Sequence, residues 1–460
     1  MTYEEAVAYL DSFVNYERTY EPQAMRAVKL ERMQRLCQRL GEPQRSFRSV
    51  LVAGTNGKGS ICAMLYSMLR ESTLRVGLYT SPHVEHLRER IRVWTSGPVV
   101  GERVYADDWI RERDFAAMMS ELHPVLEAMR RELPDSPPTY FEVLTACAFL
   151  YFTRQGVEVA VLEVGLGGRL DATNVVEQAV SAMASIDVDH TEILGADLEA
   201  ITREKAGIIK PRQEVITVPQ TASVKEVLRD VCEANGVPLW VGGEDLTVSI
   251  QRHTFDGLQI SLTGLRGVYS SLDLPLLGRH QAYNAACAVG ALEALSNTGV
   301  PYTLVERGLA LVEWPGRIEV VHDAPLVLMD GAHNPQAASA LRATLEELAG
   351  DRKIHLLIGM SSDKLVEQLG ERLAPLAESV TCSRSRHPRA MDPRALAKRV
   401  SPYCRDVRVV SEAADACTYL LNTCGSSDVI VVTGSLFLVG ELRSTLRRAG
   451  VHPRRPTVAA

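Results

Sequence analysis

Short apolar runs bounded by glycine, proline or aspartate alternate along the chain with longer stretches of helical periodicity. A parallel strand needs a helical crossover before the next one, so this alternation predicts an α/β fold with mostly parallel sheets. A helix is expected at 141–155. The strands expected in the first half of the chain are 49–53, 75–80, 158–164, 180–186 and 214–218.

The pattern changes after the first of these sheets. Residues 255–278 alternate with a period of two and contain turn glycines, which predicts a small antiparallel extension. A helix at 281–299 follows and ends on glycine. After it, strand and helix patterns alternate again. The strands expected there are 326–330, 354–359 and 428–435. We therefore predict two domains, 1–299 and 300–460.

Composition narrows the class of protein. The 460 residues are 46% hydrophobic and 23% charged, which is the balance of a globular protein, and the net charge of -7 argues against a nucleic-acid-binding surface. No run reaches the length of a membrane span, and the start "MTYEEAVAYLDS" carries acids where a signal peptide would carry basic residues. The nine cysteines form no C-x-x-C pair. That spacing favours free thiols in the cytoplasm over disulfides or a zinc site.

The segment "AGTNGKGS", residues 53–60, predicts a phosphate-binding loop, although it departs from the usual P-loop spacing. An apolar strand leads into it and a helical pattern leads out. Glycines would let backbone N–H groups approach phosphate oxygens, and the helix N-terminus adds a favourable dipole. Lys58 would reach the outer phosphates and Ser60 would ligate Mg²⁺. The alternative is a glycine-rich turn without a ligand.

Acidic and polar residues follow the next strands. Glu163 ends an apolar strand, where ligands gather in open α/β sheets, and with Ser60 it could hold Mg²⁺. Otherwise it is an edge residue in solvent. His190 follows another strand, where capping the turn is favoured over metal ligation. Lys205, beside Glu204, is by itself best explained as a surface ion pair.

The charged segment 80–94 follows the second expected strand, and Ser81 and His83 in it could face the site. Arg88, Arg90 and Arg92 alternate, so a strand would place them on one side, with a solvated basic strand as the alternative.

The second domain has its own candidates. Arg317 lies in a Pro-Gly turn, and "DGAHNP" follows an expected strand. Asn334 fits a helix N-cap and Pro335 the first helical position. Asp330 and His333 are not explained by helix initiation. They mark a second ligand site or else local turn chemistry.

The order of these motifs identifies a family. "GTNGKGS", "TSPH", "LEVGLGGRLDATN", "EKAGIIKP", "WPGR" and "DGAHNP" occur in one chain. The chain resembles the folylpolyglutamate synthase and dihydrofolate synthase family, a branch of the ATP-dependent Mur ligases, from about residue 1 to about residue 445. The family's phosphate loop has the same letters, so the unusual spacing belongs to this branch. The resemblance implies an N-terminal P-loop domain and a C-terminal Rossmann-like ligase domain.

The resemblance also implies roles for individual residues. The ATP phosphates would lie on the loop Gly54, Thr55, Asn56, Gly57, Lys58, Gly59 and Ser60. Two Mg²⁺ ions would be held by Ser60, Glu163, His190 and Ser81. Lys205 would be carbamylated by CO₂, and Asn284 would face the adenine. Arg317, Asp330 and His333 would approach the nucleotide from the second domain, which would close over the site.

The implied substrates are ATP, L-glutamate and a folate or dihydropteroate. Residues that match pterin contacts in the family are Thr139, Phe141, Asp171 and Ala172. The expected reaction is amide formation through an acyl phosphate by a bifunctional enzyme. The alternatives are folylpolyglutamate synthesis alone, a related ligase for a non-folate acid, a regulatory or transport NTPase, or a non-catalytic nucleotide-binding module. The resemblance implies a monomer, while the cysteine spacing, hydropathy and net charge predict a cytoplasmic protein without membrane or nucleic-acid partners.

Overall fold

The structure is a computed structural model that describes residues 1–451 except 20, 27–28, 96–107, 190, 196 and 297–298. The chain divides into two compact units. Unit 1 consists of Met1–Ser249, Ser261–Ser270 and Tyr283–Leu309, and unit 2 contains the remaining segments. Unit 2 therefore includes short segments that precede residue 299, and the single domain boundary placed there stays a prediction.

Unit 1 is built on a seven-stranded sheet in the order β3-β2-β4-β1-β5-β6-β7. Every pairing is parallel except β2 with β3. The strands are β1 (Arg48–Ala53), β2 (Val76–Tyr79), β3 (Ile91–Trp94), β4 (Val159–Glu163), β5 (Val180–Met183), β6 (Glu214–Thr217) and β7 (Leu239–Val241). The five expected strands are confirmed. Because β1, β4 and β5 run in the same direction, the turns that follow them meet at one edge of the sheet.

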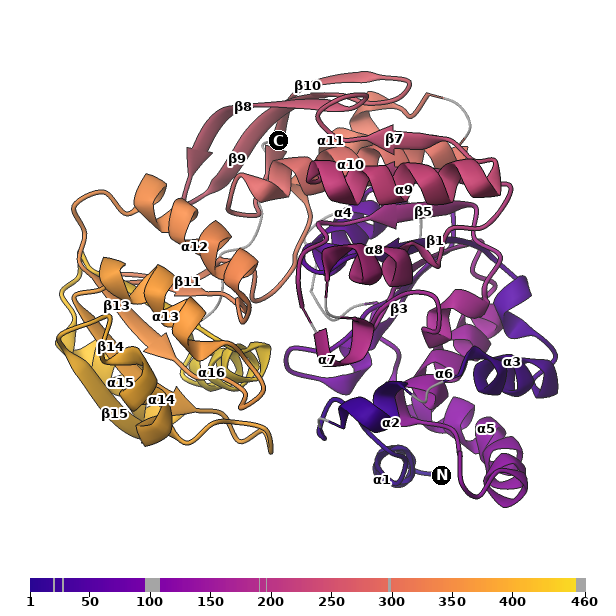
Figure 1. Ribbon diagram of the computed structural model, residues 1–460, viewed down its shortest axis with the longest axis horizontal. Helices are drawn as coiled ribbons and strands as arrows, with labels where there is room; N and C mark the ends of the chain where they lie inside the picture. Colours follow the sequence, from indigo (N-terminus) through magenta and orange to yellow (C-terminus); the bar gives the residue numbers. More distant parts are fainter. Residues whose placement is uncertain are drawn as a thin grey trace. The chain divides into compact units, whose positions relative to one another are not determined.

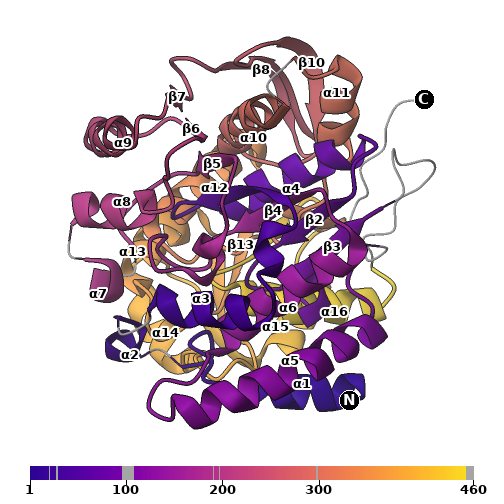
Figure 2. The ribbon, with the colours of Figure 1, turned by 90° about the vertical axis from the view of Figure 1, so that its right-hand side faces the viewer.

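Helices cover both faces of this sheet. Figures 1 and 2 show α4 and α10 on one side and α3, α5 and α6 on the other. The helices that precede β11 are α1 (Tyr3–Asp11), α2 (Pro22–Arg26), α3 (Leu30–Arg39), α4 (Lys58–Arg70), α5 (Glu112–Glu132), α6 (Tyr140–Gln155), α7 (Thr191–Leu194), α8 (Leu198–Ala206), α9 (Ala222–Asn235), α10 (His280–Ser296) and α11 (Tyr302–Ala310). The expected helices at 141–155 and 281–299 correspond to α6 and α10. Among the described helices, none is long and apolar enough to cross a membrane.

The antiparallel extension is a three-stranded sheet in the order β10-β9-β8. Its strands are β8 (Thr247–Thr254), β9 (Gly257–Thr263) and β10 (Val268–Leu274). It begins eight residues before the expected range, because β8 has no buried residue and only two apolar ones, Val248 and Ile250. Gly257 has a φ of +133° and allows the tight connection from β8 to β9.

Unit 2 is built on a six-stranded sheet in the order β11-β12-β16-β13-β14-β15. All pairings are parallel except β11 with β12. The strands are β11 (Glu319–Asp323), β12 (Leu326–Met329), β13 (Ile354–Ile358), β14 (Ser379–Arg384), β15 (Val407–Glu412) and β16 (Val429–Thr433). The three expected strands are confirmed, while the pattern missed β11, β14 and β15.

Alternate residues of these strands point to opposite faces of the sheet, and helices cover both faces. One core joins the inward residues of β13 and β16 to α12, α13 and α14. The helices of unit 2 are α12 (Pro335–Leu348), α13 (Val366–Leu373), α14 (Pro393–Val400), α15 (Ala413–Thr423) and α16 (Leu436–Arg448). The buried residues of α15 and α16 lie outside that core, as expected for helices on the second face of a parallel sheet. The α/β class predicted from the sequence is confirmed.

Candidate active site

The phosphate loop connects β1 to α4 and contains two glycines with positive φ. Gly54 has a φ of +147° and Gly57 a φ of +95°. A Cβ atom on Gly54 would lie 2.7 Å from the Cβ of Ala184, so no larger residue fits there. Gly57 is the N-cap of α4, and as a glycine it has no side chain to accept a hydrogen bond at this cap. The first turn of α4 therefore presents backbone donors at the edge of the sheet.

Two lysines converge on the carbonyl oxygen of Gly54. Lys58 Nζ donates to Gly54 O at 3.2 Å and to Thr55 O at 3.3 Å. Lys205 Nζ donates to Gly54 O at 2.9 Å from α8. Lys205 is buried, and this burial, reinforced by the charge of Lys58, lowers its pKa to about 7. The surface ion pair favoured by local sequence is therefore wrong, and Glu204 pairs with Arg169 instead.

Close backbone packing explains why Lys205 is buried. The end of α8 lies on the turn that follows β4. A Cβ atom on Gly168 would lie 2.5 Å from Lys205 O, and one on Gly207 would lie 2.3 Å from the Cβ of Arg169. Sequence reasoning missed both glycines as site residues. Their signal is present in "GLGGR" and "KAGI", but its meaning depends on the two segments meeting.

Glu163 and Ser81 come together at the ends of neighbouring strands. Glu163 ends β4, is 6% exposed, and accepts a hydrogen bond from the backbone N–H of Ser81 at 3.0 Å. The alternative of an edge glutamate in solvent is therefore wrong. Val52 of β1 lies opposite Glu163, which places this carboxylate beside the start of the phosphate loop. His190, the remaining metal candidate, lies outside the described residues.

The alternating arginines are not a solvated basic strand. Leu87–Arg90 forms a 3₁₀ turn, and only Arg92 of the three lies in β3. Arg90 is 1% exposed, donates to both carboxylate oxygens of Glu17, and also donates to His83 Nδ1 at 2.9 Å. Arg92 is also buried and forms a bidentate pair with Asp108. A buried charge is tolerated when it is paired and hydrogen-bonded, as here.

Asn284 lies beside the phosphate loop. It comes from α10, far away in sequence, and it is buried. A Cβ atom on Gly57 would lie 2.9 Å from Asn284 Oδ1. The predicted adenine residue and the predicted phosphate loop are thus brought together in unit 1.

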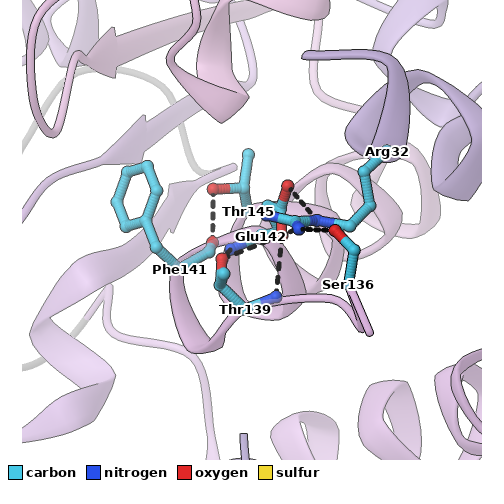
Figure 3. Close-up of polar contacts among 6 residues, drawn as sticks. All are labelled: Arg32, Ser136, Thr139, Phe141, Glu142 and Thr145. Carbon is cyan, nitrogen blue, oxygen red and sulfur yellow. Dashed lines mark hydrogen bonds and ion pairs between the residues drawn. The ribbon is translucent and has the colours of Figure 1, made fainter. Parts of the chain in front are cut away.

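The proposed pterin residues also form one neighbourhood. Thr139 caps α6 in a reciprocal capping box with Glu142, shown in Figure 3. The ring of Phe141 points away from these polar contacts and lies so close to Gly165 that a Cβ there would be 2.6 Å from its Cζ. Asp171 accepts hydrogen bonds at 3.0 Å from the backbone N–H groups of Gly165 and Leu166. Phe141 and Asp171 therefore flank the same turn.

Burial raises the pKa of the Asp171 carboxyl, although its hydrogen bonds oppose the shift. The carboxylate also accepts from the backbone N–H of Thr173, so Asp171 caps the short 3₁₀ turn Ala172–Val175. Sequence reasoning missed Glu142 and Arg32. Arg32 of α3 donates to both oxygens of Glu142, and it also donates to Ser136, so it fixes the start of α6 (Figure 3).

In unit 2 the "DGAHNP" turn is held by its own side chains. Asp330 accepts from the backbone N–H groups of Ile318 and Ala332, both at 2.9 Å. Burial raises the pKa of Asp330, while the positive charge of Arg317 opposes the shift. His333 Nδ1 lies 2.8 Å from Gly331 O. Asn334 caps α12 by accepting from Ala337 N at 3.0 Å, with Pro335 at the first helical position, as the sequence predicted.

Residues 114–292 match the Mur ligase middle domain, and residues 316–436 match the Mur ligase glutamate ligase domain. A Bacillus subtilis dihydrofolate synthase/folylpolyglutamate synthase is 32% identical over 91% of this chain and 95% of its own length. The chain belongs to this family of Mur ligases. It is a ligase, and the resemblance seen in its motifs is confirmed.

Other relatives agree with this family. A Mycobacterium tuberculosis dihydrofolate synthase/folylpolyglutamate synthase is 35% identical over 91% of this chain and 90% of its own length. The structure of M. tuberculosis folylpolyglutamate synthase complexed with ADP and AMPPCP superimposes with a TM-score of 0.86 at 32% identity, covering 99% of this chain and 100% of that one. An Escherichia coli structure in complex with DHPP and ADP gives a TM-score of 0.83 at 28% identity, covering 98% and 99%.

Proposed function

We propose that this ligase uses ATP to join L-glutamate to the carboxylate of dihydropteroate and to that of a reduced folate. The observation that carries the proposal is the glycine-capped start of α4 together with the preceding loop, where Lys58 and Lys205 converge on Gly54 O. Such a cradle suits a polyphosphate, because backbone donors, a helix dipole and a lysine all favour negative charge. The printed names of the relatives support the folate class of substrate.

The residues fit the implied nucleotide and metal. The phosphates of ATP would lie on Gly54–Ser60, where a larger residue at Gly54 would collide with Ala184. Glu163 and Ser60 supply the oxygen ligands that Mg²⁺ prefers, and Ser81 and His190 complete the proposed set for a second ion. When bound, Mg²⁺ would neutralise charge on the phosphoryl oxygens. Asn284 would contact the adenine, and the roles of Arg317, Asp330 and His333 stay predictions.

The proposed reaction has two balanced steps. An oxygen of the substrate carboxylate attacks the γ-phosphorus of ATP, the bond to the β-phosphate oxygen breaks, and ADP leaves. The neutral amine of glutamate then attacks the acyl carbon, inorganic phosphate leaves with the electron pair of the broken C–O bond, and the amine nitrogen gives up a proton to solvent. Lys58 would hold the transferring phosphoryl group in position through both steps.

Lys205 is proposed to react with CO₂ before catalysis. Its neutral amine would attack the carbon of CO₂ and release a proton to solvent, which turns a cation into an anionic carbamate beside the metal ligands. Only the neutral amine is nucleophilic, and a pKa of about 7 makes that form abundant at neutral pH. A carbamate would also remove the repulsion between Lys205 and Lys58, which now lowers the pKa of Lys205.

The choice among substrates rests on Thr139, Phe141, Asp171 and Ala172. The flat ring of Phe141 beside the turn held by Asp171 would offer a pterin one stacking surface and a set of polar groups. This neighbourhood supports the bifunctional enzyme over folylpolyglutamate synthesis alone. A ligase for a non-folate acid remains the alternative that the assay must separate, and a cytoplasmic monomer is part of the proposal.

The test measures release of ADP in the presence of Mg²⁺, ATP and glutamate, in parallel assays with dihydropteroate and with tetrahydrofolate. The products are identified by mass spectrometry. One added glutamyl unit on each substrate supports the bifunctional assignment. A product from tetrahydrofolate alone removes dihydropteroate from the substrates. Absence of product with either acid, in a preparation that binds ATP, would contradict the folate assignment.

The carbamate has its own test by trapping with an alkylating agent in ¹³C-bicarbonate, followed by peptide mass analysis. Labelling of Lys205 should rise between about pH 6 and pH 8, because the neutral fraction of a group with a pKa of about 7 rises over that interval. Lys205→Ala should lose ligation, with partial recovery in added acetate or formate. Plain lysine at position 205 under these conditions contradicts the carbamate and leaves the ligase assignment intact.

A further inference from the structure

Three side chains of metal-binding type lie together at the amino-terminal edge of the sheet in unit 2. His355 is the second residue of β13, Asp428 directly precedes β16, and Cys424 is the C-cap of α15. One ligand atom from each lies within 4.8 Å of the other two. In the described part of the chain, this is the one group of three such residues. It lies at the opposite edge from Asp330, because β12, β13 and β16 are parallel and Asp330 follows the carboxyl end of β12.

The strand register explains why His355 and Asp428 meet. Ile354 lies opposite Val429 in the parallel pair β13 and β16. His355, which follows Ile354, is therefore a diagonal neighbour of Asp428, which precedes Val429. His355 Nε2 lies 3.5 Å from Asp428 Oδ2. This separation is long for a hydrogen bond, but two ligands of one tetrahedral zinc ion lie about 3.3 Å apart, given metal distances near 2.0 Å.

The hydrogen bonds around the cluster leave one nitrogen of His355 available. His355 Nδ1 lies 2.8 Å from Ser379 Oγ, which orients the ring. His355 Nε2 is buried and has no hydrogen-bond partner among the described residues. In metal-ligating histidines the ring nitrogen that does not bind the metal is usually held by a neighbouring polar group, as Nδ1 is held here by Ser379. Asp428 is oriented as well, because its Oδ2 accepts from Gly425 N at 2.7 Å.

We propose that His355, Cys424 and Asp428 form a binding site for a zinc ion, with solvent in the fourth position. One imidazole nitrogen, one thiolate and one carboxylate form a donor set that suits Zn²⁺ and not Mg²⁺. The thiol of Cys424 gives up its proton to solvent as the sulfur–zinc bond forms. All three residues are half-buried, and shifts of about 1 Å would bring the ligand atoms to bonding distance.

The position of the site indicates what it does. A bound ion would join the end of α15 and the turn 424–428 to β13, at the edge of the sheet away from Asp330. It would therefore stabilise unit 2 and leave the ligation chemistry unchanged. Cysteine spacing alone argued against a zinc site, because one cysteine lies in this trio and its partners are 4 and 69 residues away in sequence.

The experiment uses the full chain, freed of metal with a chelator and titrated with Co²⁺ in the absence of ATP and Mg²⁺. Cobalt bound to a thiolate shows a sulfur-to-metal charge-transfer absorption. We expect this band to saturate at one Co²⁺ per chain and to disappear as Zn²⁺ is added. Cys424→Ser should lose the band, and His355→Gln should weaken Co²⁺ binding by at least about tenfold.

The matched control is Cys404→Ser, a cysteine of unit 2 whose thiol donates to the backbone oxygens of Ala377 and Asp406. This variant should keep the band. Zn²⁺ should raise the unfolding temperature of the wild-type chain and of Cys404→Ser, but not that of Cys424→Ser. Absence of the band in the wild-type chain, or an unchanged band in both Cys424→Ser and His355→Gln, would overturn the site. His355→Gln keeps the thiol, so it decides the question if Cys424→Ser fails to fold.

Discussion

Two strand-to-helix turns in this chain treat the backbone N–H groups at the start of the helix in opposite ways. In unit 1, "AGTNGKGS" leads from β1 to α4 and places at the helix cap Gly57, which has no side chain to accept a hydrogen bond. In unit 2, "DGAHNP" leads from β12 to α12, where Asn334 caps the helix and Asp330 binds two backbone N–H groups. One turn leaves backbone donors to a ligand, and the other uses its own side chains.

The difference teaches how to distinguish a ligand-binding turn from a self-sufficient one. An anion at a helix N-terminus competes with a capping side chain for the same N–H groups. The glycine-only cap therefore costs stability when no ligand is bound, whereas the asparagine cap stabilises its helix without a ligand. Substitutions in the first turn should affect ligation most, whereas substitution of the capping residue Asn334 in the second should affect folding most.

The largest effect is expected from Lys58→Ala. This change removes the cation that lies on the loop carbonyls, so ligation should fall by at least about 100-fold, as expected when charge stabilisation of a transferring group is lost. The measurement is ADP release together with amide product. Lys225→Ala, which breaks only an ion pair with Glu244 near the surface, is the control and should stay close to wild type.

Glu163→Gln should raise the Mg²⁺ concentration needed for half-maximal ligation by about tenfold or more, because a carboxylate binds this ion better than an amide does. A Mg²⁺ titration of activity measures the shift. Glu158→Gln is the matched control, since Glu158 lies just before the opposite end of β4 and is half exposed. Equal Mg²⁺ curves for Glu163→Gln and wild type would remove Glu163 from the metal site.

Gly57→Ala should both strain the loop and push Asn284 away, because the new methyl group would lie 2.9 Å from Asn284 Oδ1 at a φ of +95°. Gly236→Ala is the matched control, with a φ of +64° and nothing within 4 Å of its Cβ. Gly236→Ala should cost about 1–2 kcal/mol of stability with activity retained, and Gly57→Ala should cost more and lose nucleotide affinity. Equal effects in urea unfolding and in ATP binding would show that the loop tolerates a side chain.

Asn334→Ala should have the smallest effect, a loss of about 1 kcal/mol in the unfolding of unit 2, because one capping hydrogen bond disappears. Thermal unfolding of the variant measures it. Asn334→Ser and Asn334→Asp keep a capping oxygen and should recover most of the loss. If all three variants are equally unstable, the side chain of Asn334 does more than cap α12.

Local sequence was sufficient for several features of the site. The strands before Gly54 and Glu163, the start of α12 at Asn334 and the phosphate loop were predicted from short windows, because apolar periodicity, glycine and capping chemistry act over a few residues. Lys205, Arg90 and Arg92 were misjudged from the same windows. Their burial depends on partners that lie 151, 73 and 16 residues away in sequence, namely Gly54, Glu17 and Asp108.

The sequence by itself determined the α/β class, the turns at the strand ends, and the family. It did so because hydrophobic period and turn chemistry are local properties of the chain. Only the tertiary structure decided which charged groups are buried away from solvent. It placed Lys205 against Gly54 by packing Gly168 and Gly207 at close range. It also brought His355, Cys424 and Asp428 together through the register of β13 and β16. A pKa or a metal site depends on the surroundings in space, and those surroundings exist only once distant segments have met.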